Sequence, residues 1–327
     1  MASIANIFYF FRSRLFRYLI FAGVLVLLFL FCCRCQSAAT LLLRGELLRA
    51  NMVEDWSEKD GTFIKDIVYD KKKNLAYDLY LPKNYERKRQ NYAMLFIHGG
   101  SWNSGDKEQM SFACKRFAKA GYVTATMNYS LAGKGRGQVN FFTMLKDIGN
   151  CLAHLKMSME KRGVSIRKAA LSGFSAGGHL AMLYAFTRKK ASPIEIAFVF
   201  QQVGPTLFTP EAWGNKKEFA LSLASAGAGK RITAEDYAKG RNLEVIKSIS
   251  PALLVNKDTV PGIYAYGGRD TLVAPIHGQK LEEALKKNKV PHQVIIFPNS
   301  GHILSQDPKM LFRFHMWVLE YCKKYFR

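Results

Sequence analysis

The chain has 327 residues, of which 49% are hydrophobic and 22% are charged, which is the composition of a globular protein with a large core. Its 48 Lys and Arg residues outnumber its 25 Asp and Glu residues, so the net charge is +23. No zinc-finger spacing, basic zipper or RNA-binding signature accompanies this charge, which argues against nucleic acid as a partner. The basic residues are dispersed, so we expect a solvated surface, with association with an anionic envelope or membrane as the alternative.

Residues 1–39 are typical of an export signal. Arg12, Arg14 and Arg17 form a basic flank before an apolar run at residues 18–33, and small side chains at residues 37–39 suit cleavage. The sequence predicts a signal peptide or, alternatively, an uncleaved membrane anchor. Either reading places residues 40–327 outside the cytoplasm as a single domain, secreted, periplasmic or anchored.

Six cysteines are present, and none has metal-ligand spacing. We therefore expect no metal and no cofactor. Cys114, Cys151 and Cys322 are scattered through predicted helices, and buried free thiols are the simplest expectation for them.

Eight apolar runs predict strands, and helical patterns separate most of them, which favours a mainly parallel sheet with helices on both faces. The first two runs alternate and are joined by a turn, so they predict an antiparallel hairpin at a sheet edge. Residues 204–250 break this rhythm and are expected to form a small lid insertion. The predicted strands cover residues 63–69, 75–81, 93–97, 122–127, 167–171, 194–203, 263–266 and 293–297.

The motif Gly173-Phe174-Ser175-Ala176-Gly177 stands between a predicted strand and a predicted helix. A serine on such a sharp turn is pushed out of the sheet with its hydroxyl exposed, and the crowded backbone requires the two glycines. The helix would point its N-terminus at the reacting centre, where negative charge develops. The motif alone is weak evidence, so its meaning depends on partners elsewhere in the chain.

Such partners follow other predicted strands, each at a glycine-containing turn. Asp270 and His302 come after Ser175 in the order of Ser…Asp…His hydrolases, at strand ends that meet at one edge of a parallel sheet. An imidazole exchanges protons near neutral pH, so His302 suits the general base, and Asp270 would hold its tautomer. Asp258 is an inferior alternative because it precedes its strand.

Oxyanion donors are expected from the backbone N–H of Ala176 and from the loop at residues 99–101, whose glycines let the backbone approach the substrate. His98 is expected to brace this loop, and His179 to pack. Trp102 could wall the acyl site or pack, and Trp213 could belong to the lid.

Four stretches together resemble α/β-hydrolase carboxylesterases. The group that they resemble most contains bacterial feruloyl and acetylxylan esterases, with kynurenine formamidases and hormone-sensitive-lipase-like esterases nearby. This chain has Ser101 where many relatives have a third glycine. The stretches are Tyr77-Asp78-Leu79-Tyr80-Leu81-Pro82, the ten residues from His98 to Lys107, Asn128-Tyr129-Ser130-Leu131, and the nine residues from Gly173 to Ala181.

The resemblance covers roughly residues 64–325 and implies the α/β-hydrolase fold, with a mainly parallel eight-stranded sheet. By motif position it implies that the nucleophile, acid and base are Ser175, Asp270 and His302. It also implies that the oxyanion donors are Gly100, Ser101 and Ala176.

We therefore expect a serine carboxylesterase that acts through an acyl-enzyme on short-chain or aromatic acyl esters, with acetylated or feruloylated carbohydrates as candidate substrates. The insertion at residues 204–250 offers too little apolar surface for a deep lipid tunnel. Two alternatives stay open: an amide, peptide or formamide hydrolase on the same triad, and a catalytically inactive binding module of the same fold.

Overall fold

The computed structural model describes residues 54–87, 90–133 and 139–327. The predicted signal or anchor at residues 1–39 lies outside these described residues. Within them, none of the helices combines the length and the apolar character that crossing a membrane requires.

Eight strands form one sheet in the order β1-β2-β4-β3-β5-β6-β7-β8. β2 pairs antiparallel with β1 and β4, and every later neighbour pair is parallel, so the predicted mainly parallel eight-stranded sheet is confirmed. The strands are β1 (Gly61–Asp70), β2 (Leu75–Pro82), β3 (Gln90–Ile97), β4 (Val123–Met127), β5 (Ser165–Phe174), β6 (Glu195–Gln202), β7 (Gly262–Gly267) and β8 (His292–Phe297).

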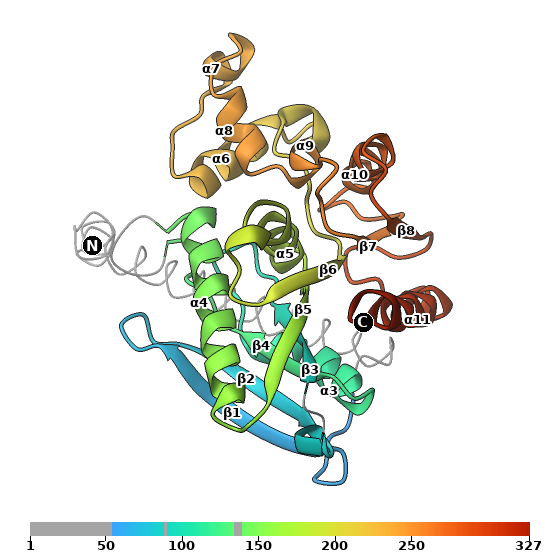
Figure 1. The fold of residues 1–327 in the computed structure, drawn as a ribbon. Helices are drawn as coiled ribbons and strands as arrows, with labels where there is room; N and C mark the ends of the chain where they lie inside the picture. Colours follow the sequence, from blue (N-terminus) through green and yellow to red (C-terminus); the bar gives the residue numbers. More distant parts are fainter. Residues whose placement is uncertain (1–53, 88–89, 134–138) are drawn as a thin grey trace, which may run out of the picture. The chain divides into compact units, whose positions relative to one another are not determined.

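Helices cover both faces of the sheet (Figure 1). On one face, α3 (Ser111–Lys119) packs on β2, β3 and β4, while α11 (Pro308–Tyr325) packs on β6, β7 and β8. On the other face lie α4 (Phe141–Glu160), α5 (Ala176–Thr187) and α10 (Ile276–Lys287). Every residue of α5 except its last, Thr187, is buried. The reason is that α5 lies in the middle of the helical layer, above β5 and β6.

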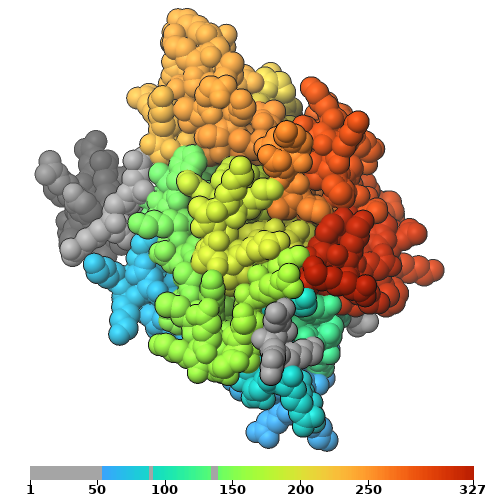
Figure 2. All heavy atoms as spheres, in the orientation of Figure 1, coloured from blue at the N-terminus to red at the C-terminus, as the bar shows by residue number. Residues whose placement is uncertain are grey.

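The insertion between β6 and β7 folds into short helices (Figure 1). These are α6 (Lys217–Ala228), α7 (Ala234–Ala238), α8 (Leu243–Ser248) and α9 (Pro251–Leu254), preceded by the 3-10 turn η4 (Pro210–Trp213). In the space-filling view the insertion projects at the top, beside α10 (Figure 2). Of its large apolar side chains, Phe208, Trp213 and Leu221 are buried, whereas Phe219 is 47% exposed.

The three cysteines among the described residues are free and buried, as expected. Burial raises the pKa of the Cys114 and Cys151 thiols, which keeps both protonated and unreactive. The described part of the fold therefore depends on packing and hydrogen bonding.

Candidate active site

Ser175 sits on the sharp turn between β5 and α5. Its backbone has φ +53°, a left-handed conformation that non-glycine residues seldom adopt and that is typical of a strained functional turn. A Cβ at Gly173 would overlap the backbone of Gly177, and one at Gly177 would overlap the Ile97 carbonyl. Both glycines of the motif are thus required by close backbone contacts, as the sequence predicts.

The structure brings Ser175, His302 and Asp270 together in one hydrogen-bonded chain. His302 Nε2 lies 2.9 Å from Ser175 Oγ, and His302 Nδ1 lies 2.7 Å from Asp270 Oδ2. The Asp270 side chain is buried, and its other oxygen accepts hydrogen bonds from the backbone N–H of Leu272 (2.8 Å) and Val273 (2.9 Å). These contacts fix the carboxylate so that it can accept from Nδ1–H and leave Nε2 free to take a proton.

Asp258, the weaker candidate for the acid, lies elsewhere. It is exposed and precedes β7, whereas Asp270 follows the carboxyl end of that strand. Its backbone carbonyl accepts from Lys189 Nζ, and its own backbone N–H donates to Asn256. Of the two candidates, Asp270 is the one that contacts His302.

Three backbone N–H groups, in the loop after β3 and at the start of α5, have no acceptor among the described residues. Among the described residues, the N–H groups of Gly100, Ser101 and Ala176 donate no hydrogen bond. Ala176 is the first residue of α5, where the helix N-terminus favours negative charge. Ser101 and Trp102 have φ +51° and +61°, so Ser101 adopts the left-handed conformation for which glycine is better suited.

His98 and His179 have supporting positions. His98 is buried, stacks on Tyr129 with ring centroids 4.4 Å apart, and donates from Nδ1 to the Gly99 carbonyl at 2.7 Å. His179 accepts a hydrogen bond from Trp102 Nε1 (3.2 Å) and donates to the Ile249 carbonyl (2.9 Å). A single buried imidazole thus joins the loop that carries Trp102 to the segment between β6 and β7.

Trp102 and Trp213 are packing residues in the described structure. Trp102 is 5% exposed and contacts the rings of Phe141, Phe208 and His179. Trp213 is 8% exposed and packs edge-on against His277, with centroids 5.1 Å apart. Neither indole is thus an open wall of the site.

Sequence reasoning missed the structural part played by His277. It is buried on α10, and its Nδ1 accepts from the backbone N–H groups of Thr206 (3.2 Å) and Leu207 (3.3 Å). The ring therefore ties the segment after β6 to α10. No local pattern around His277 signals these contacts, because they join residues about 70 positions apart.

Asp307 is a second residue that the sequence did not single out. Its buried carboxylate accepts from Ser300 Oγ (2.7 Å), from the Asn299 backbone N–H (3.0 Å) and from the Asn299 side-chain amide (2.9 Å). These bonds close the loop that carries His302. Within the described ranges, no three His, Cys, Asp or Glu side chains are grouped so that they could hold a metal ion.

Acidification is expected to destabilise the fold through His179 and His277. Burial lowers the pKa of each ring to about 4, whereas histidine in an unfolded chain titrates near ~6.5. Between these values the unfolded chain binds more protons, so stability is complete above about pH 6.5 and falls as the pH drops toward 4. The expected loss is roughly 2–4 kcal/mol for each ring.

Thermal unfolding between pH 7.5 and 4.5 measures this effect. His277→Gln should flatten part of the pH slope, because it removes one of these two buried rings. A melting temperature that stays constant over this range would contradict the prediction.

The fold and this constellation define an α/β-hydrolase: a mostly parallel sheet with the serine turn after β5, the acid after β7 and the histidine after β8. The chain belongs to the BD-FAE family, whose profile matches residues 77–285.

Other known proteins are similar over much of the chain. It is 22% identical over 222 residues to Esterase LipC of Mycobacterium tuberculosis. The aligned stretch covers 64% of this chain and 52% of that protein. This chain thus spans about half the length of that relative. A truncated carbohydrate esterase from gut microbiota has a TM-score of 0.65 at 17% identity, covering 82% of this chain and 99% of the other. Esterase B from Lactobacillus rhamnosis has a TM-score of 0.66 at 20% identity, covering 89% and 93%.

Proposed function

We propose that this protein is a serine carboxylesterase that forms an acyl-enzyme on Ser175. The observation that carries the proposal is the unbroken hydrogen-bonded chain from Ser175 through His302 to Asp270, with bonds of 2.9 and 2.7 Å. The N–H groups of Gly100, Ser101 and Ala176, which donate to no described residue, support the same chemistry, because acyl transfer passes through an oxyanion that needs such donors. Membership of the BD-FAE family and the esterase names of its relatives add support.

In the proposed reaction, Ser175 Oγ attacks the acyl carbon while His302 Nε2 takes the hydroxyl proton. The carbonyl oxygen becomes an oxyanion and accepts from the N–H groups of Gly100, Ser101 and Ala176. When the tetrahedral intermediate collapses, the bond to the alcohol breaks and His302 returns the proton to the leaving oxygen. Water then attacks the acyl-enzyme with His302 again as the base, which releases the acid and restores the serine.

We propose short-chain or aromatic acyl esters as substrates, with acetylated or feruloylated carbohydrates as the natural class. The burial of Phe208, Trp213 and Leu221 supports this choice, because these insertion side chains pack into the protein. A long acyl chain would need to bury many methylene groups, each contributing ~0.8 kcal/mol, against apolar walls. The likeness to a carbohydrate esterase from gut microbiota favours a carbohydrate alcohol.

A series of p-nitrophenyl esters tests the proposal. We expect kcat/KM to be highest for acetyl to butyryl esters and to fall by octanoyl, and a fluorophosphonate to label the protein covalently. Acetylated and feruloylated sugars, compared in parallel, test the alcohol side. Preference for dodecanoyl esters with activation at a lipid interface would overturn the substrate choice. Cleavage of amides or formamides alone would favour the amidase alternative, and failure to label would favour an inactive binding module.

A further inference from the structure

The loop from His98 to Asp106 carries two of the proposed oxyanion donors, so its conformation decides where they point. The Gly100 carbonyl accepts from the backbone N–H of Ser104 (3.0 Å) and from its hydroxyl (2.8 Å). A trans peptide unit is planar and directs its C=O and N–H groups to opposite sides. The Ser104 bonds therefore fix the direction of the Ser101 N–H. The rigidity of the loop therefore depends on the residues that hold its two ends.

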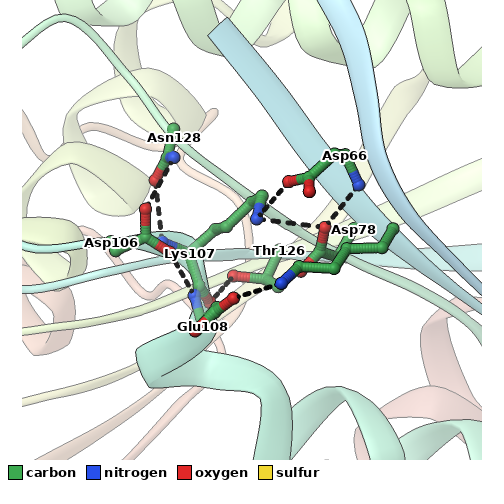
Figure 3. A network of polar contacts seen from close by, with 8 residues as sticks. Asp66, Asp78, Asp106, Lys107, Glu108, Thr126 and Asn128 are labelled. Carbon is green, nitrogen blue, oxygen red and sulfur yellow. Dashed lines mark hydrogen bonds and ion pairs between the residues drawn. The ribbon is translucent and has the colours of Figure 1, made fainter.

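The far end of the loop is clamped to the segment after β4 by a side-chain amide (Figure 3). Asn128 Oδ1 accepts from the Lys107 backbone N–H (2.7 Å), and Asn128 Nδ2 donates to Asp106 Oδ2 (2.9 Å). The other oxygen of Asp106 accepts from the Glu108 N–H at 2.9 Å. Both groups of the amide are thus used in one orientation only, and both oxygens of the carboxylate are occupied.

The buried ion pair of Lys107 with Asp78 supports the contacts that Asn128 makes. Lys107 is only 3% exposed, and its Nζ lies 2.7 Å from Asp66 and 3.2 Å from Asp78. Burial alone would lower the pKa of Lys107, but the hydrogen bonds and charges of these two carboxylates outweigh burial and raise it, so the ammonium stays charged. The Lys107 carbonyl in turn accepts from Thr126 Oγ1 on β4 at 2.7 Å.

The near end of the loop is held by the next residue of the same segment. Tyr129 donates its hydroxyl to the His98 carbonyl at 3.1 Å and stacks on the His98 ring. The Asn128 carbonyl accepts from the Tyr69 hydroxyl on β1 at 2.6 Å, which fixes this segment to the sheet. Two adjacent residues, Asn128 and Tyr129, therefore hold both ends of the loop.

We propose that Asn128 and Asp106, supported by the Lys107–Asp78 ion pair, are positioning residues that set the oxyanion donors of Gly100 and Ser101. The inference rests on the proposed esterase function. It also gives a common structural reason for three sequence stretches, around Asp78, Asp106 and Asn128, that no step of the reaction uses directly.

Exchanging the two side chains provides the test. Asp106→Asn alone would set its amide N–H against a donor in either orientation, the Asn128 amide or the Glu108 backbone N–H. Asn128→Asp alone would set two carboxylates against each other. The double variant restores one donor and one acceptor: Asn at 106 donates to Asp at 128, which still accepts from the Lys107 N–H. We expect each single variant to lower kcat about 10- to 100-fold with KM changed less than about twofold, because the oxyanion exists only in the transition state. The double variant should recover to within about threefold of the original kcat.

Asp60→Asn is the matched control, since Asp60 also accepts two hydrogen bonds, both from Ser57 in a separate turn. It should leave kcat unchanged. Asp106 is exposed, so Asp106→Asn is expected to fold even if Asn128→Asp does not, and thermal melts of all variants report this. An active original enzyme whose single variants keep full kcat, or whose folded double variant is no better than the singles, would overturn the positioning role and leave the esterase assignment standing. An original enzyme that neither turns over esters nor reacts with a fluorophosphonate would overturn both.

Discussion

Ser175→Ala is expected to lower kcat for p-nitrophenyl acetate by roughly 10⁴-fold or more, because no other described hydroxyl lies at His302 Nε2. The Ser175 side chain makes no capping bond to α5, so its hydroxyl contributes little to the fold. The melting temperature should therefore stay within a few degrees of the original. Initial rates on purified protein, together with a thermal melt, measure both expectations.

Ser192→Ala is the control for this change, because Ser192 lies beyond the far end of α5. Covalent labelling by a fluorophosphonate should disappear in Ser175→Ala and persist in Ser192→Ala. Near-normal turnover by a correctly folded Ser175→Ala protein would refute the acyl-enzyme route.

Asp270→Asn is expected to reduce kcat by about 10⁴-fold through the tautomer of His302. The new amide oxygen would still accept from the N–H groups of Leu272 and Val273, which leaves the amide NH₂ facing His302 Nδ1. His302 Nδ1 would then have to accept from this amide, so the imidazole proton would sit on Nε2. An imidazole in this form cannot take the proton of Ser175.

Asp258→Asn is the control, because Asp258 is the other aspartate considered for this role. It should leave kcat unchanged, since Asp258 is exposed at the opposite end of β7. KM should change little in either variant, because neither carboxylate is expected to contact the bound ester. A loss of less than tenfold in Asp270→Asn would mean that another group orients the imidazole.

The strands were predictable from sequence because of where each one lies. Residues 93–97 and 263–266 are continuous apolar runs, and β3 and β7 are indeed buried on both faces of the parallel region. The turn between the first two runs correctly predicted the hairpin of β1 and β2 at the edge of the sheet, although β2 itself is buried on both faces. The candidate triad was predictable for a related reason: each of its residues follows a strand at a glycine-containing turn, which is a local signal.

The supporting contacts were not predictable, because they are polar and join distant parts of the chain. Lys107 pairs with Asp78 on β2, and Asn128 meets Asp106 with 21 residues between them, without any periodicity that could indicate either pairing. The helices of the insertion were also missed, since short segments such as α7 and α8 are stabilised by tertiary packing more than by propensity. Structure alone locates such partners.

The contacts of the His179 imidazole limit how the segment between β6 and β7 can be engineered. Any replacement of the segment between β6 and β7 would have to keep one contact, because the Ile249 carbonyl in this segment accepts from the buried N–H of His179. A graft that omits this carbonyl would leave the N–H unsatisfied, at a cost of about 1–3 kcal/mol. It would also release the ring that holds Trp102 beside Ser101. The segment between β6 and β7 and the loop at residues 98–106 would therefore have to be exchanged or redesigned together.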